Sequence, residues 1–276
     1  MHLCFSSNSL FYKYGKKEGE VCLACQLPQC PDPYYYLCDV NGYIGFIKNL
    51  TKNDNDEYLT LTSSTKKSIK IAITDVRKKR SMKQHKLGAC LQPIHLMTNY
   101  ALFIQYFEYW LNEGVTKFYI YWESYTPEVK RILDIYNKTS GVEFEFVEWS
   151  RLPTLPNVTT ATNPNSYWFQ LEVFLAIFDC MHRARHQVKF IPQTDLDEMM
   201  YVRNGPLIDF LEKVDTKNPN MAAMLVLSRK VQLTKYNDYK LSSPREYSFD
   251  VYQKLKVDSE PSSIYRKLIY RPERVS

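Results

Sequence analysis

The sequence predicts an α/β protein in which helices flank a mostly parallel sheet, with an irregular, cysteine-rich β region before it. In residues 87–276, short segments of strand-forming residues alternate with amphipathic segments long enough for helices. Strands and helices that alternate in this way form βαβ units, whose strands run parallel. Residues 1–86 lack this alternation and hold four of the seven cysteines in one short stretch. The 276 residues provide enough chain for both parts.

The first part, residues 1–86, is predicted to contain a strand at Ile69–Val76, where β-branched residues cluster after a long polar stretch. The basic run Arg77–Lys86 follows it. We interpret this run as a solvated connector between the two parts, and a nuclear-localisation patch is the alternative.

Five short apolar segments of the second part are predicted to be strands. They are Ala89–His95, Val115–Glu123, Val142–Trp149, Val188–Gln193 and Met221–Ser228. Polar and apolar residues alternate in the third of these strands, which predicts that one of its faces is buried. The last strand is apolar along nearly its whole length, which predicts a buried strand.

Four longer segments carry apolar residues at helical spacing and are predicted to be helices. They are Thr98–Gly114, Thr126–Gly141, Asn165–His186 and Gly205–Asp215. Thr98 is expected to cap the first helix and Gly114 to end it. In the second helix, Thr126 is the expected N-cap, Pro127 the first helical residue and Gly141 the stop.

Three carboxylates follow the predicted strand Val188–Gln193, namely Asp195, Asp197 and Glu198. In an extended segment, side chains two residues apart project to the same side, so Asp195 and Asp197 can face one point. Glu198 would then turn away or be bent back by the following turn. Two adjacent carboxylates repel each other unless a cation intervenes, and Mg²⁺ or Mn²⁺ prefers such oxygen ligands. The alternative is a helix cap or a solvated turn.

The order of motifs from Cys90 onward resembles glycosyltransferase family 92, whose members are inverting Golgi enzymes with a GT-A fold. The motifs are CLQPIH (Cys90–His95), the helix–Gly–strand–helix segment Ala101–Tyr136, VEFEFVEW (Val142–Trp149), FDCMHRARHQVKFIPQTDLDEMM (Phe178–Met200) and RKLIYRPERV (Arg266–Val275). A single D-x-D motif is weak evidence, but the ordered set is much more specific.

The resemblance implies that residues 87–276 form a GT-A-like glycosyltransferase domain that depends on Mn²⁺ or Mg²⁺. It would transfer a hexose, galactose from UDP-galactose being the expected donor, to a glycan acceptor with inversion. Asp195 and Asp197 would bind the metal, and Glu198 and Asp179 would help to hold the nucleotide sugar. For Asp179, an ion pair with Arg183 one helical turn later is an equal alternative.

Two features of the expected catalytic site stay open. The base that takes the proton from the acceptor hydroxyl is unassigned, and Asp238, Glu246 and Asp250 are available for it. The family's metal-binding His follows the Arg-Pro strand, whereas this sequence ends at Ser276. We therefore expect a domain shortened at its C-terminal end. The alternative function is that of a catalytically incomplete relative that binds glycan or nucleotide or acts as a scaffold.

The cysteines bear on the cellular compartment. Cys22, Cys25, Cys30 and Cys38 could bind zinc, as in a nuclear protein, but only the first pair has zinc spacing. Disulfides in a secretory lumen are the favoured interpretation. Cys180 lies on an apolar helix face and is expected to be a core or disulfide residue rather than a nucleophile.

The remaining features agree with a secretory-pathway enzyme. The net charge of +6 suits an anionic ligand without indicating nucleic acid. Three glycosylation sequons occur, at Asn49, Asn137 and Asn157. The sequence contains neither a signal peptide nor an apolar run long enough to span a bilayer. Association with the Golgi membrane, which the resemblance implies, is therefore expected only through a segment absent from this chain.

Overall fold

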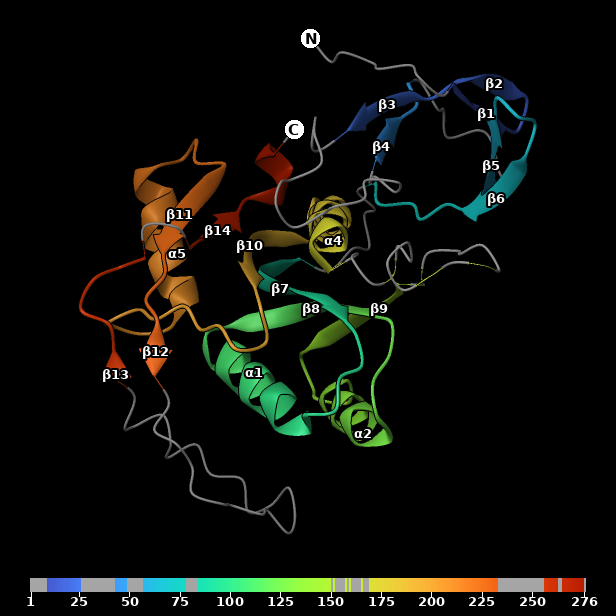
Figure 1. Ribbon diagram of the computed structural model, residues 1–276. Helices are drawn as coiled ribbons and strands as arrows, with labels where there is room; N and C mark the ends of the chain where they lie inside the picture. Colours follow the sequence, from blue (N-terminus) through green and yellow to red (C-terminus); the bar gives the residue numbers. More distant parts are fainter. Residues whose placement is uncertain are drawn as a thin grey trace. The chain divides into compact units, whose positions relative to one another are not determined.

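The computed structural model contains two compact units, residues 1–75 with 152–175 and residues 76–151 with 176–276 (Figure 1). The structure describes residues 9–25, 43–48, 57–77, 84–149, 169–232, 256–262 and 265–275, together with the single residues 151, 157, 159 and 165. The basic run and the four clustered cysteines therefore lie partly outside the described residues.

The first unit is built from antiparallel strands. One sheet has the strand order β2-β1-β5-β6, and β3 pairs with β4 in a separate two-stranded sheet. The strands are β1 (Leu10–Tyr14), β2 (Lys17–Glu20), β3 (Cys22–Cys25), β4 (Tyr43–Phe46), β5 (Tyr58–Ser63) and β6 (Ser68–Ala72). Gly15 allows the tight turn between β1 and β2, because its φ of 57° lies in the left-handed region. Cys22 is disulfide-bonded.

The second unit contains the predicted α/β sheet, which has six strands in the order β11-β14-β10-β7-β8-β9. Its strands are β7 (His85–Ile94), β8 (Val115–Trp122), β9 (Glu143–Glu148), β10 (Val188–Thr194), β11 (Ala223–Leu227) and β14 (Arg266–Tyr270). The four strands β10, β7, β8 and β9 run parallel, whereas β14 is antiparallel to both of its neighbours. The prediction of a mostly parallel sheet is confirmed.

Helices cover both faces of this sheet. They are α1 (Tyr100–Asn112), α2 (Pro127–Tyr136), α4 (Phe169–Ala184) and α5 (Leu207–Lys217). Figure 1 shows α1 and α2 on one face and α4 on the other. A short strand pair, β12 (Val231–Gln232) with β13 (Lys256–Val257), and the 3₁₀ turn η3 (Pro272–Arg274) complete the described elements. No described helix is long and apolar enough to cross a membrane.

Strand β8 is buried on both faces and organises two cores. Phe118 and Ile120 point to the face of α1 and α2, where Phe107 packs edge-to-face on Phe118. Tyr119 and Tyr121 point to the opposite face, toward α4. Because consecutive side chains of a strand alternate between faces, a continuous apolar run is what a central strand of an α/β sheet requires. Burial of each large apolar side chain contributes roughly 1.5–3 kcal/mol to the free energy of unfolding.

Two expected helix ends were placed wrongly. The first helix is capped by Asn99 instead of Thr98, since the Asn99 side chain accepts a hydrogen bond from the amide of Ala101. The second helix begins as predicted, with Thr126 as N-cap and Pro127 first, but it ends at Tyr136 rather than Gly141. Gly141 has a positive φ of 83° in the later turn that leads to β9.

The last predicted strand is not buried as expected. β11 is an edge strand whose only described neighbour in the sheet is β14. Leu225 remains 50% exposed and Leu227 55% exposed, because only one face of the strand packs against the core. Strand β7 begins at His85, two residues before the expected start of the second part at residue 87, and that division of the chain stays a prediction.

Glu113 joins the end of α1 to the start of α5. Its side chain is largely buried and accepts a hydrogen bond of 2.6 Å from the amide of Leu207, the first residue of α5. The N-cap residue of α5 is Pro206, whose side chain makes no capping hydrogen bond. Glu113 therefore satisfies an amide that the helix leaves unpaired and places negative charge at the positive end of its dipole.

Replacing Glu113 by Ala is expected to lower the free energy of unfolding by about 1–3 kcal/mol, because the Leu207 amide then loses its partner. Urea unfolding followed by circular dichroism measures this loss. Asn112→Ala at the exposed neighbouring position is the control and should change stability little. An equal loss in both variants would contradict the capping role of Glu113.

Candidate functional site

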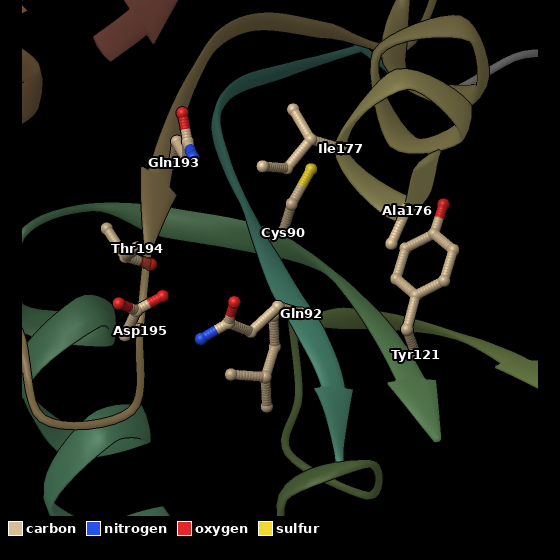
Figure 2. A pocket seen from close by; sticks show the side chains of 9 residues that line it. Cys90, Gln92, Tyr121, Ala176, Ile177, Gln193, Thr194 and Asp195 are labelled. Carbon is tan, nitrogen blue, oxygen red and sulfur yellow. The ribbon is translucent and has the colours of Figure 1, made fainter. Parts of the chain in front are cut away.

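The candidate site lies at the carboxyl edge of the parallel strands. Asp195 follows β10 directly, and β10 pairs with β7 through Thr194 and Leu91. A small cavity of about 10 Å³ opens beside them. It is lined by Cys90, Leu91, Gln92, Tyr121, Ala176, Ile177, Gln193, Thr194 and Asp195. Figure 2 shows the Gln92 amide extending toward the Asp195 carboxylate, with Tyr121 on the far side. Ligands of open α/β sheets bind at this edge.

The acidic turn, Asp195–Glu198, closes on itself through two hydrogen bonds. The amide of Glu198 donates to the carbonyl of Asp195 at 3.2 Å. The amide of Asp195 donates to Oε2 of Glu198 at 3.1 Å. Glu198 is therefore bent back toward the start of the turn, which is the second of the two orientations that the sequence allowed.

Lys267 of β14 binds both carboxylates of the acidic turn. Its Nζ lies 3.0 Å from Oδ2 of Asp195 and 2.7 Å from Oε2 of Glu198. Burial by itself lowers the pKa of Lys267, but its hydrogen bonds to the two carboxylates and their charges outweigh burial and raise the pKa above its ordinary value. Burial raises the pKa of Glu198, and the nearby charge of Asp195 adds to this while Lys267 opposes it. The two carboxylates thus converge on one cationic group.

Asp197 is placed differently from the other two carboxylates. It is exposed within the turn and is not among the residues that line the cavity. It forms no ion pair with the described residues. The structure therefore brings together Asp195 and Glu198, and Asp197 is left facing solvent. The expected pairing of Asp195 with Asp197 on a metal stays a prediction.

The oxygen atoms at this turn fit a hard divalent cation. Two carboxylates that already hold an ammonium group offer the charge and the ligand type that Mg²⁺ and Mn²⁺ prefer. Within the described ranges, no group of three or more His, Cys, Asp or Glu side chains is arranged to hold a metal. A site with so few protein ligands leaves most of the coordination shell to phosphate oxygens and water, as is usual for Mg²⁺.

Asp179 on α4 is held in place from two sides. Its Oδ2 accepts hydrogen bonds of 2.6 Å from the Tyr121 hydroxyl and of 2.6 Å from Nε of Arg183. Arg183 also donates to Glu145 of β9 at 2.9 Å. Burial raises the pKa of Tyr121, and Asp179 raises it further. The ion pair between Asp179 and Arg183 that the sequence offered as an alternative is therefore present. A role for Asp179 toward a donor remains a prediction.

A disulfide joins Cys90 of β7 to Cys180 of α4, and Cys180 is thus a disulfide residue as expected. Both cysteines are buried in the core beneath α4. The bond connects the strand that carries Gln92 with the helix that carries Asp179. It therefore fixes two walls of the cavity relative to each other.

A further carboxylate at the same edge of the sheet, after strand β8, escaped the sequence analysis. Glu123 follows β8, and its side chain is only 7% exposed. It accepts from Nδ1 of His95 at 2.9 Å and from Nε of Arg151 at 2.6 Å. A carboxylate directly after a strand is the local signal that identified Asp195. The same signal could have identified Glu123.

The other expected positions are surface residues or lie outside the described residues. Asn137 and Asn157 are exposed, as acceptors of a glycan must be, and Asn49 lies outside the described residues. The three residues available as catalytic base, Asp238, Glu246 and Asp250, also lie outside them.

Comparison with known proteins identifies a protein family. The sequence model described as Glycosyltransferase family 92 matches residues 85–276, which includes the whole six-stranded sheet, the acidic turn and Lys267. No curated protein matches the chain.

Proposed function

Because the chain belongs to glycosyltransferase family 92, we propose that the acidic turn binds a nucleotide-diphosphate hexose together with Mn²⁺ or Mg²⁺. The observation that carries this proposal is the convergence of Asp195 and Glu198 on one cationic group at the carboxyl edge of the parallel sheet. The expected donor is UDP-galactose, and the expected product is a glycan extended with inversion at the transferred sugar.

The residues at this edge would have different roles in the transfer. Asp195 would bind the divalent ion through a carboxylate oxygen, and Asp197 would join it if the turn rearranges. When bound, the ion supplies a positive charge that stabilises the leaving diphosphate. Asp179, fixed by Tyr121 and Arg183, would hold a donor hydroxyl in a defined position.

Inversion defines the chemistry of the transfer step. The acceptor oxygen forms a bond to the anomeric carbon on the face opposite the diphosphate, and the bond between that carbon and the diphosphate oxygen breaks. The proton of the acceptor hydroxyl passes to a carboxylate acting as base. The diphosphate leaves with the bonding electron pair.

We further propose a secretory-pathway location, and the Golgi is the compartment expected for this family. The Cys90–Cys180 disulfide supports an oxidising lumen, since disulfides are rare in the cytosol and nucleus. Cys22 is disulfide-bonded as well, which supports the disulfide interpretation of the clustered cysteines over zinc.

Titration of the full chain with UDP in the presence and absence of Mn²⁺ tests this function. The wild-type chain should bind UDP only with Mn²⁺, and Asp195→Asn should weaken binding by at least about tenfold, or about 1.4 kcal/mol. Asp258→Asn, at an exposed position after β13, is the matched control and should bind as the wild type does. Asp197→Asn, measured in parallel, decides whether Asp197 contributes a ligand.

Two results would argue against the proposal. UDP binding that does not need Mn²⁺ would show that the site holds the nucleotide without a metal. An Asp195→Asn variant that binds both ligands as tightly as the wild type would place the donor elsewhere.

A further inference from the structure

A groove of about 610 Å³ lies between α5, the segment 200–204, and strands β11 and β14. Its size falls within the range of small-molecule binding sites, roughly 300–1,000 Å³. Leu207, Val226 and Ile269 contribute apolar side chains, and Leu207 and Ile269 are almost fully buried. Tyr201 and Phe210 also line it, and these aromatic residues are 84% and 37% exposed. The groove is thus mostly apolar, with aromatic side chains accessible from solvent.

The charged side chains that line this groove in the described part of the chain are both positive. They are Arg203 and Lys213, and no described Asp or Glu lines it. Both are exposed, and neither forms an ion pair with another residue in the described part of the chain. Uncompensated cations beside an apolar surface attract a ligand that combines apolar groups with a negative charge.

The groove and the acidic turn share one face of the sheet. Ile269 lines the groove, and Lys267, two residues earlier on β14, projects to the same face and binds the acidic turn. Across the strand pair, Val226 of the groove is the direct partner of Lys267. Segment 200–204 begins two residues after Glu198. A ligand in the groove would therefore lie next to the proposed donor site.

The groove does not have the chemistry of a site for sugar rings. Sugar hydroxyls need both hydrogen-bond donors and acceptors, whereas the charged side chains here can only donate. Among the described lining side chains, only the Asn204 amide and the Tyr201 hydroxyl carry an acceptor oxygen. An apolar chain needs no hydrogen bonds, and a phosphate or carboxylate at its end needs only donors.

We propose that this groove binds an amphipathic anion, a small molecule in which an apolar chain carries a phosphate or carboxylate. We assign this molecule as the non-sugar part of the acceptor, and this assignment rests on the proposed transferase function. The binding itself follows from the groove and does not depend on that function.

Dodecyl phosphate below its micelle concentration is the probe, and isothermal titration of the full chain is the measurement. Neutral dodecyl maltoside and inorganic phosphate should each bind at least about tenfold more weakly, because each lacks one of the two required features. The double variant Arg203→Gln/Lys213→Gln should lose about tenfold in affinity for dodecyl phosphate. Lys138→Gln/Lys217→Gln removes two exposed charges outside the groove and should bind as the wild type does.

Three outcomes would overturn the proposal. They are equal affinity for the maltoside and the phosphate ester, unchanged affinity in the double variant, and no binding of dodecyl phosphate. Displacement of dodecyl phosphate by a hexapeptide of alternating valine and glutamate at lower concentration would assign the groove to a protein partner instead.

The donor site is measured separately in the same proteins. The Arg203→Gln/Lys213→Gln variant should bind UDP and Mn²⁺ as the wild type does. Binding of dodecyl phosphate without any binding of UDP would leave the groove as a site and remove the proposed transferase function. Loss of UDP binding in the groove variant would show that the two sites are not separate, and would overturn the inference.

Discussion

Replacing both Cys90 and Cys180 by alanine is expected to lower the free energy of unfolding of the second compact unit by about 4 kcal/mol. The disulfide closes a loop of 90 residues. In the chain-entropy description of disulfides, a loop of this length restricts the unfolded chain by about 4–5 kcal/mol at 25 °C. Both side chains are buried, so alanine also loses some packing, although it buries no new polar group. Urea unfolding with and without reductant measures the effect.

The two single variants separate the cross-link from the packing. If the covalent bond carries the effect, Cys90→Ala, Cys180→Ala and the double variant should lose similar amounts, because each removes the same bond. Reductant should then destabilise the wild-type chain by more than it destabilises the double variant, which keeps the disulfide of Cys22. Additive losses in the single variants, or an equal reductant effect in the wild type and the double variant, would contradict this explanation.

The sequence predicted the strands of the parallel sheet well because their pattern is local. β8 and β10 are buried on both faces, and such strands need continuous apolar and β-branched runs that are visible without the fold. β11 carries the same kind of run, yet it is an edge strand with Leu225 and Leu227 exposed. An apolar run alone does not reveal where a strand lies in the sheet, because that depends on β14, which follows almost forty residues later and inserts beside β10.

The acidic turn shows the same limit at the site. Asp195 was predicted to lie at the carboxyl edge, because a polar residue directly after a buried strand is a local signal. The orientation of Glu198 depends on its hydrogen bond to the Asp195 amide and on Lys267, which is 72 residues from Asp195. Lys267 stands in an ordinary strand sequence, and only the antiparallel insertion of β14 brings it to the turn. No pattern within the strand indicates that contact.

Replacing Lys267 by methionine is expected to raise the affinity of the chain for Mn²⁺ in the absence of nucleotide by about tenfold, or about 1.4 kcal/mol. Its ammonium group lies within 3.0 Å of Asp195 and 2.7 Å of Glu198, so a divalent ion that binds these oxygens must compete with it. Methionine keeps a similar length and removes the charge. The two carboxylates are then left without their cation, and their repulsion favours any cation that can replace it. Titration of Mn²⁺ followed by electron paramagnetic resonance measures free and bound metal directly.

Lys86→Met is the matched control, because Lys86 forms an ion pair of 3.2 Å with Glu212 and is far more exposed than Lys267. This variant should bind Mn²⁺ as the wild type does. If Lys267 only supports the fold of the turn, removing it would loosen the ligands and weaken Mn²⁺ binding. A fall or no change in Mn²⁺ affinity would therefore contradict competition, and a rise is what competition alone explains. A rise combined with weaker UDP binding at saturating Mn²⁺ would show that the displaced ammonium group contacts the diphosphate. Asp195, Glu198 and Lys267 would then act together in holding the donor.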